Sequence, residues 1–171
     1  MTWNDTFLAL FDRCAAAYQS GNQDFESYYT DDDRGFLAEI GCQTREFFDF
    51  VEDYCSEGEP SISTALLIAA VRRDYFLTIQ GGIPSDKRLT RDDVPPFGEE
   101  LNGMAYLPRL LAKGRAKLRG ELDPDLMFCC GGDRNFFAKH GNIHPADFLR
   151  NLWSAGTDDQ KIAAWVMEQH D

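Results

Sequence analysis

The chain has 171 residues, of which 43% are hydrophobic and 13% aromatic, and it carries a formal net charge of −12 at pH 7. A chain of this length buries about two thirds of its unfolded surface, and this apolar content excludes an intrinsically disordered protein. The acidic composition also opposes nucleic-acid binding, which depends on a basic surface.

Neither a membrane segment nor an export signal is visible in the sequence. The most apolar stretch, residues 65–71, runs directly into Arg72 and Arg73, far short of the roughly 20 residues of a membrane helix. The first residues lack the basic and apolar regions of a secretory signal. Five cysteines, an odd number, favour free thiols in a reducing compartment. We therefore expect a cytoplasmic protein.

Hydrophobic residues at helical spacing predict four helices in the first 80 residues. Each begins at a residue that can cap it, and a glycine directly follows each of the four. Asn4 or Asp5 caps the first, and a capping box of Thr30 and Asp33 opens the second. The predicted helices cover about residues 5–20, 30–40, 44–57 and 61–80. Residues 75–79 could form a strand instead, but a single strand would have no partner.

Residues 81–102 contain six glycines and prolines up to Gly98, and this density excludes a long regular element. We predict an irregular connector here. Helical patterns resume beyond it, and Pro145 and a capping box of Thr157 with Gln160 open the last two helices. The predicted segments are about 107–119, 124–130, 133–140, 145–155 and 157–168, with Asp133 as the cap of the third.

The order of these elements repeats after 100 residues. Between Leu8 and Gly41, seven of 34 positions are identical to those 100 residues later, among them Asp33 with Asp133 and Arg34 with Arg134. Ordinary composition gives roughly two identities by chance. Duplication explains the match better than convergent helix patterning, which stays open as the alternative.

We therefore predict an all-α fold of two pseudo-symmetric four-helix modules that pack face to face. The N-terminal module covers residues 1–80, the connector 81–102 and the C-terminal module 103–171, together in one compact unit.

The second half resembles a known family. Leu107-Pro108-Arg109, followed by Lys113, Arg115 and the helix-ending Gly120, resembles the bacterial family catalogued as domain of unknown function 5069. Later helices of that family are matched by three further motifs: Asp133-Arg134-x-Phe136-Phe137, Asp147-Phe148-Leu149 and Trp165-Val166. The resemblance covers about residues 97–169 and implies a helical domain, with no reaction or ligand. The first half is interpreted as a diverged copy from the internal match alone.

A basic stripe follows the connector. On a helix, Arg109, Lys113 and Lys117 share one face, because they recur every four residues. We expect this face to be solvated. The alternative is docking against the acidic first third, where residues 1–60 hold 14 acids and 3 bases, within the chain or across a homo-oligomer.

The densest group of reactive side chains is Cys129 and Cys130, with His140 and His144 downstream. These residue types suit zinc, or a thiol nucleophile with a histidine base. Adjacent cysteines in a helix point about 100° apart, and Gly141 separates the histidines. We therefore predict no cofactor and no metal, with buried or capping roles for these four residues and a zinc site as the alternative.

Two further groups are candidates for binding. Asp133 and Arg134 lie at a predicted helix start and match Asp33 and Arg34, so the same pair either supports the scaffold or forms an anion site. The second group is Arg72, Arg73 and Tyr75, beside the connector.

No common catalytic motif is present. Our leading hypothesis is a binding or regulatory module for a protein or a small anionic ligand. The alternative is a thiol- or metal-dependent enzyme that uses Cys129, Cys130, His140 and His144, so the sequence leaves open whether the protein is an enzyme.

Overall fold

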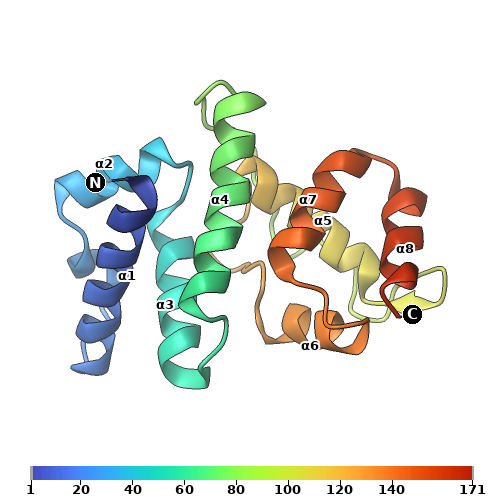
Figure 1. Cartoon of the computed structure of the whole chain (residues 1–171), viewed down its shortest axis with the longest axis horizontal. Coiled ribbons are helices and arrows are strands. Elements are labelled where there is room, and N and C mark those ends of the chain that lie inside the picture. Colours follow the sequence, from blue (N-terminus) through green and yellow to red (C-terminus); the bar gives the residue numbers. More distant parts are fainter. Residues whose placement is uncertain (1, 171) are drawn as a thin grey trace. The chain divides into compact units, whose positions relative to one another are not determined.

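The structure, a computed structural model, describes residues 2–170 and is mainly α-helical, as predicted (Figure 1). The chain divides into two compact units, one that ends at Ile83 and one that begins at Pro84. This boundary falls inside the predicted connector. Within residues 2–170, no helix combines the length and the apolar composition needed to cross a membrane.

The N-terminal unit contains four α-helices and one short 3-10 helix in its described residues. They are α1 (Trp3–Gln19), the 3-10 helix η1 (Phe25–Tyr28), α2 (Asp31–Glu39), α3 (Thr44–Glu57) and α4 (Ile62–Thr78). An aromatic core joins α1 to α3, because the ring of Phe47 lies edge-on against Phe7 and Phe11, at centroid distances of 5.1 and 5.7 Å. Residues 75–78 are helical, so the alternative of a strand at 75–79 is wrong.

The predicted capping box of α2 is confirmed, since Thr30 Oγ1 accepts from the Asp33 amide while the Asp33 carboxylate accepts from the Thr30 amide. The predicted cap of α1 is wrong by two or three residues. Thr2 is the N-cap, and Asp5 is the acidic partner of its capping box. Asp5 therefore acts from the third helical position, where an acidic side chain can reach back to the cap amide.

The C-terminal unit contains four α-helices and a two-stranded antiparallel hairpin in its described residues. They are β1 (Glu100–Leu101), β2 (Met104–Ala105), α5 (Leu107–Arg119), α6 (Gly131–Lys139), α7 (Pro145–Ala155) and α8 (Asp159–Glu168). Helices α5 and α7 approach closely at Gly114, where an added Cβ would lie 2.6 Å from Leu152 Cδ2.

Three sequence predictions in this unit are wrong. Residues 124–130 form turns and not a helix, because Cys129 adopts a left-handed φ of 71° and its amide bonds to the Asp133 carboxylate instead of a helical carbonyl. Asp133 is the third residue of α6, whose N-cap is Cys130. In addition, α8 is capped by Asp158, one residue after the predicted Thr157.

Two helices of the N-terminal unit, α2 and α3, have counterparts at the predicted spacing in the C-terminal unit. Helices α2 and α6 start and end 100 residues apart, and α3 and α7 start 101 residues apart. The second offset matches the one-residue insertion expected from the sequence. The internal duplication and its pseudo-symmetry stay predictions.

Candidate functional site

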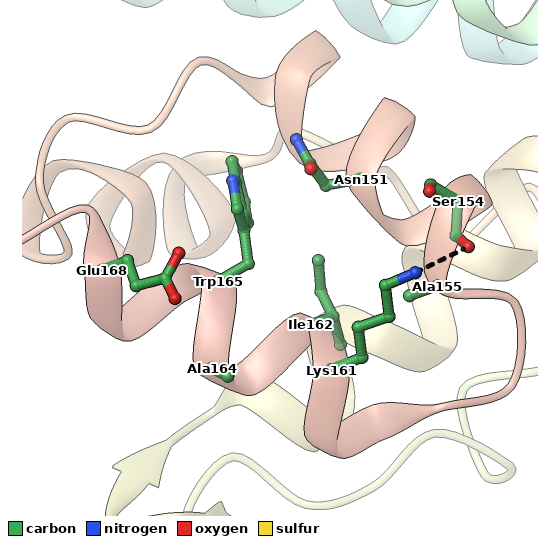
Figure 2. A pocket seen from close by; sticks show the side chains of 8 residues that line it. All are labelled: Asn151, Ser154, Ala155, Lys161, Ile162, Ala164, Trp165 and Glu168. Carbon is green, nitrogen blue, oxygen red and sulfur yellow. Dashed lines mark hydrogen bonds between the residues drawn. The ribbon is translucent and has the colours of Figure 1, made fainter.

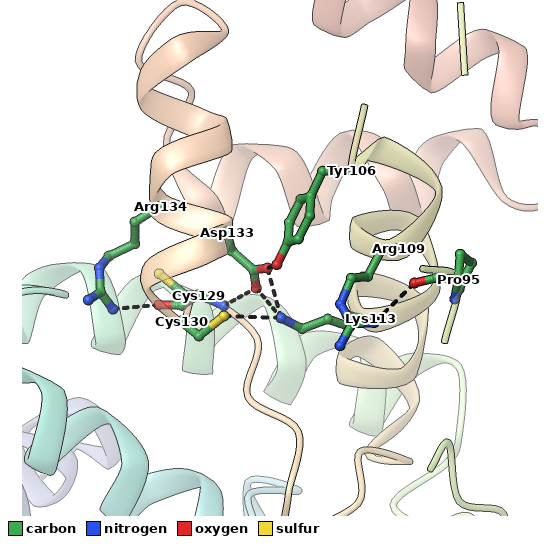
Figure 3. A network of polar contacts seen from close by, with 8 residues as sticks. All are labelled: Pro95, Tyr106, Arg109, Lys113, Cys129, Cys130, Asp133 and Arg134. Carbon is green, nitrogen blue, oxygen red and sulfur yellow. Dashed lines mark hydrogen bonds and ion pairs between the residues drawn. The ribbon is translucent and has the colours of Figure 1, made fainter. Parts of the chain in front are cut away.

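A buried ion pair joins α5 to the first turn of α6 (Figure 3). Lys113 Nζ donates to the two carboxylate oxygens of Asp133 at 2.7 and 2.8 Å, and the side chains are 3% and 0% exposed. The carboxylate also accepts from the Tyr106 hydroxyl at 2.7 Å and from the Cys129 amide at 2.8 Å. Four hydrogen bonds from three residues therefore satisfy a carboxylate that has lost its water.

The basic stripe of α5 is buried, so the prediction of a solvated face is wrong. Arg109, Lys113 and Lys117 are all at or below 9% exposure. The reason is visible for two of them: the Asp133 carboxylate binds Lys113, and the chain at Pro95 and Phe97 covers Arg109. These side chains are not exposed for docking to an acidic surface.

Arg109 is a buried cation whose bonding is incomplete. Its Nη1 donates to the Pro95 carbonyl at 3.0 Å, and its guanidinium carbon lies 4.3 Å from the centre of the Phe97 ring. The Nε atom is buried and has no hydrogen-bond acceptor. Within residues 2–170, no carboxylate lies at ion-pair distance from Arg109. Its Nη2 atom also donates no hydrogen bond to these residues.

Phe97 and Tyr106 connect Arg109 to the ion pair. The Phe97 ring is 68% exposed and lies 5.8 Å from the Tyr106 ring, with 30° between the planes. Burial, with the Asp133 carboxylate beside the phenol, raises the pKa of Tyr106. The phenol therefore stays protonated and donates its hydrogen bond at neutral pH.

Two residues of this polar cluster have a backbone conformation that residues other than glycine rarely adopt. Tyr106 has a φ of 77° and Cys129 a φ of 71°, in the left-handed region where a Cβ meets the backbone. Each places a donor on Asp133. Strain of this kind persists where surrounding contacts enforce it, and it is frequent at functional sites.

The N-terminus of α6 lacks the cap of α2. Cys130 occupies the N-cap position and makes no side-chain capping hydrogen bond, whereas Thr30 does so in α2. Gly131 and Gly132 replace the acids found in the first turn of α2. The half-buried Cys130 thiol lies 3.2 Å from Lys113 Nζ.

The predicted pair of Asp133 and Arg134 belongs to this cluster. Arg134 Nη1 donates to the Cys129 carbonyl at 2.9 Å, while Asp133 accepts from the amide of the same residue. The pair therefore holds both polar groups of Cys129. In the N-terminal unit, Arg34 likewise donates to a backbone carbonyl, that of Glu26, at 2.8 Å.

The histidines lie apart from this arrangement. His140 Nδ1 is 2.8 Å from His170 Nε2, and its ring stacks on Phe136 at 4.2 Å. His144 caps α7 by accepting from the Ala146 amide at 3.2 Å. In the described part of the chain, no group of three or more His, Cys, Asp or Glu side chains is placed to hold a metal ion. Zinc binding by the four predicted candidates thus has no geometric support.

The remaining candidates lie on α4 of the N-terminal unit. Arg72 is buried, donates to Gln80 Oε1 at 2.7 Å and lies over the Phe76 ring, whereas Arg73 lies over the Trp3 ring. Tyr75 is half-buried on the same helix. The predicted binding residues are thus divided between two units.

The sequence did not predict a surface pocket between α7 and α8, with a volume of about 320 Å³ (Figure 2). It is lined by Asn151, Ser154, Ala155, Lys161, Ile162, Ala164, Trp165 and Glu168. Lys161 and Glu168 bring opposite charges, and Lys161 Nζ lies 3.5 Å from the Ser154 carbonyl. Nothing in this lining selects one kind of ligand.

The sequence also gave little signal for Pro95, Phe97 and Tyr106. An aromatic residue within a Pro-Pro-Phe-Gly turn was the only available sign, because this composition places a large apolar side chain in a loop.

Comparison with known proteins supports the resemblance found from the sequence. Residues 96–171 match the family model described as Domain of unknown function (DUF5069). The match includes α5 to α8 and every residue of the polar cluster from Phe97 onward. Neither the curated proteins nor the solved structures give a match to the chain.

Proposed function

Starting from a C-terminal unit similar to a family of unknown function, we propose that this unit is a binding module for a small anionic ligand and that Arg109 holds the anionic group. The observation that carries the proposal is the buried Nε of Arg109, which has no acceptor. A buried donor without a partner costs about 1–3 kcal/mol, and more when it is charged. A ligand oxygen would remove that cost.

The neighbouring cation supports this interpretation. Lys113 lies one helical turn from Arg109 and is also buried, yet it has the Asp133 carboxylate as its partner. Arg109 has a carbonyl and an aromatic ring. Neither neutralises its charge, which an anion would.

The geometry of the guanidinium indicates how the anion would bind. Nη1 is used by the Pro95 carbonyl, which leaves the edge formed by Nε and Nη2. Two parallel N–H groups on such an edge match the two oxygens of a carboxylate or phosphate. The ligand would therefore bind in a bidentate arrangement from the side of the guanidinium.

Binding affinity for acetate and inorganic phosphate tests the proposal. We expect the wild-type protein to bind at least one of them, and Arg109→Lys to weaken binding at least tenfold, because an ammonium keeps the charge but loses the paired donors. Arg150→Lys is the matched control, since Arg150 is exposed on α7 and pairs with Asp147. Equal affinities of wild type and Arg109→Lys would contradict the proposal.

A second candidate function uses Cys130 as a nucleophile. Its support is the position of the half-buried thiol, which lies at the start of α6 and 3.2 Å from the Lys113 ammonium, since reactive cysteines often lie beside cations at helix N-termini. Iodoacetamide labelling tests it, with the half-buried Cys42 and Cys55 as internal controls. Cys130 must react faster than both, and equal or slower labelling would remove this candidate.

A further inference from the structure

We infer that the ligand of Arg109 is a carboxylate attached to an apolar, preferably aromatic, body, and that Phe97 binds this body. The inference rests on the proposed anion binding at Arg109 and adds the chemical class of the ligand. Three features of the described residues carry it: the exposure of Phe97, its position on Arg109, and the charge of the chain around it.

Phe97 is a large apolar side chain that the fold leaves in water. Its side chain is 68% exposed, whereas phenylalanines such as Phe128 and Phe148 are buried in the core of the same unit. Its ring is nevertheless held in place, because it lies over the Arg109 guanidinium at 4.3 Å and beside the Tyr106 ring at 5.8 Å. An ordered and exposed aromatic ring is a favourable surface for stacking, since its conformational entropy is already reduced.

The position of Phe97 links the apolar contact to the anion. Its ring covers the same guanidinium whose Nε lacks an acceptor. A carboxylate bound to the Nε and Nη2 edge would therefore place the atoms attached to it near the rim of the Phe97 ring. Acetate would leave that rim in water, whereas a phenyl or alkyl group would cover it and gain hydrophobic free energy.

The charge of the surrounding chain favours a single negative charge on the ligand. Exposed acids lie on both sides of Phe97 in the sequence, with Asp92 and Asp93 before it and Glu99 and Glu100 after it. Arg109 and the exposed Arg91 supply two positive charges against these four acids. A doubly charged phosphate would meet more repulsion than a monocarboxylate, so we expect carboxylates to bind more tightly.

The same chemistry occurs on free small molecules and at the C-terminus of a peptide that ends in an apolar residue. Phenylacetate represents the first source, and an N-acetylated tripeptide ending in phenylalanine represents the second. The tripeptide amide is the control for the second source, because it keeps the ring and loses the carboxylate.

The test compares the affinities of acetate, phenylacetate and the tripeptide for wild type, Phe97→Ala and Phe97→Leu. For wild type we expect phenylacetate or the tripeptide to bind at least tenfold more tightly than acetate, and the amide not to bind. Phe97→Ala should abolish this preference, so that acetate and phenylacetate bind to the variant with similar affinities. Phe97→Leu should keep part of it. Thermal unfolding of each variant confirms that the exposed side chain is not needed for folding.

Two negative results are distinguishable. If acetate binds through Arg109 but phenylacetate and the tripeptide bind no better, or if Phe97→Ala keeps the preference, this inference is wrong and the proposed function stands. If no carboxylate binds and phosphate also fails, the proposed function is wrong and the inference falls with it.

Discussion

Lys113 and Asp133 form a buried ion pair 20 residues apart in the sequence, and Arg13 and Asp33 form an ion pair with the same separation in the N-terminal unit. Both pairs join the first long helix of a unit to the third residue of the next one. They differ in environment, because the Arg13 and Asp33 side chains are 54% and 13% exposed. This difference decides how much each pair matters for stability.

Removing the cation should therefore have unequal effects in the two units. Lys113→Met leaves the Asp133 charge buried without its main partner, and we expect a loss of about 3–5 kcal/mol in the unfolding free energy of the C-terminal unit. Arg13→Met, the matched control, should cost about 0–1 kcal/mol. Urea unfolding measures both. Similar losses in the two variants would show that burial does not govern these pairs.

The two glycines at the start of α6 should respond oppositely to substitution. A Cβ on Gly131 would have only Arg134 Nη2 nearby, at 3.8 Å, so Gly131→Asp should raise the unfolding free energy by about 0.5–1 kcal/mol through its charge at the helix N-terminus. A Cβ on Gly132 would lie 2.8 Å from the Tyr106 hydroxyl.

Gly132→Ala should accordingly displace that hydroxyl from Asp133 and lower the unfolding free energy by about 1–3 kcal/mol. Thermal unfolding of the two single variants tests the pair. Stabilisation by Gly132→Ala would contradict the contact between Tyr106 and this turn.

Asp49 on α3 should make the N-terminal unit less stable as pH rises. Burial raises the pKa of its carboxyl to about 7, and Arg45, 2.9 Å away, only partly offsets this. The folded state therefore retains a proton that the unfolded state, with the ordinary value of 3.8, has lost. Since the folded form binds more protons, this contribution to stability is present below pH 4 and is lost as pH rises towards 7.

Asp49→Asn should remove this dependence and be more stable than wild type at pH 8. Unfolding free energies of both proteins at several values between pH 4 and pH 8 provide the measurement. A wild-type protein whose N-terminal unit gains stability from Asp49 above pH 7 would contradict the assignment.

His140 should have the opposite effect on the C-terminal unit, making it less stable as pH falls. Burial lowers the pKa of its imidazole most, and the nearby His170 and Lys139 lower it further. The unfolded state then binds the proton first as pH falls, so this contribution to stability is present above about pH 6.5 and decreases on acidification. His140→Gln should flatten the decrease between pH 7 and pH 5 in thermal unfolding. An unchanged slope in that variant would show that His140 is not its source.

Local sequence signals predicted the helices well. Thr30 with Asp33, Gly120 and His144 before Pro145 each lie at the expected helix end. These signals work because caps and stops depend on backbone groups within four residues. The helix predicted at residues 124–130 does not form, because the Asp133 carboxylate, a few residues later, accepts a hydrogen bond from the Cys129 amide.

The candidate site was less predictable because it depends on what covers a helix face. Spacing placed Arg109 and Lys113 on one face of α5, but it could not show that Asp133 and Phe97 would bury that face. Tyr106 gave no signal of its own, since its role follows from a left-handed backbone at the start of α5.

The resonance of the Arg109 Nε–Hε group in nitrogen-15 NMR tests the proposed binding function most directly, because it reports on the buried donor that the ligand is proposed to bind. Adding phenylacetate should shift this resonance in a saturable way, slow the exchange of Hε with water, and leave the exposed Arg150 unchanged. A resonance that does not respond to saturating acetate, phenylacetate or phosphate would contradict the claim that Arg109 holds an anionic ligand.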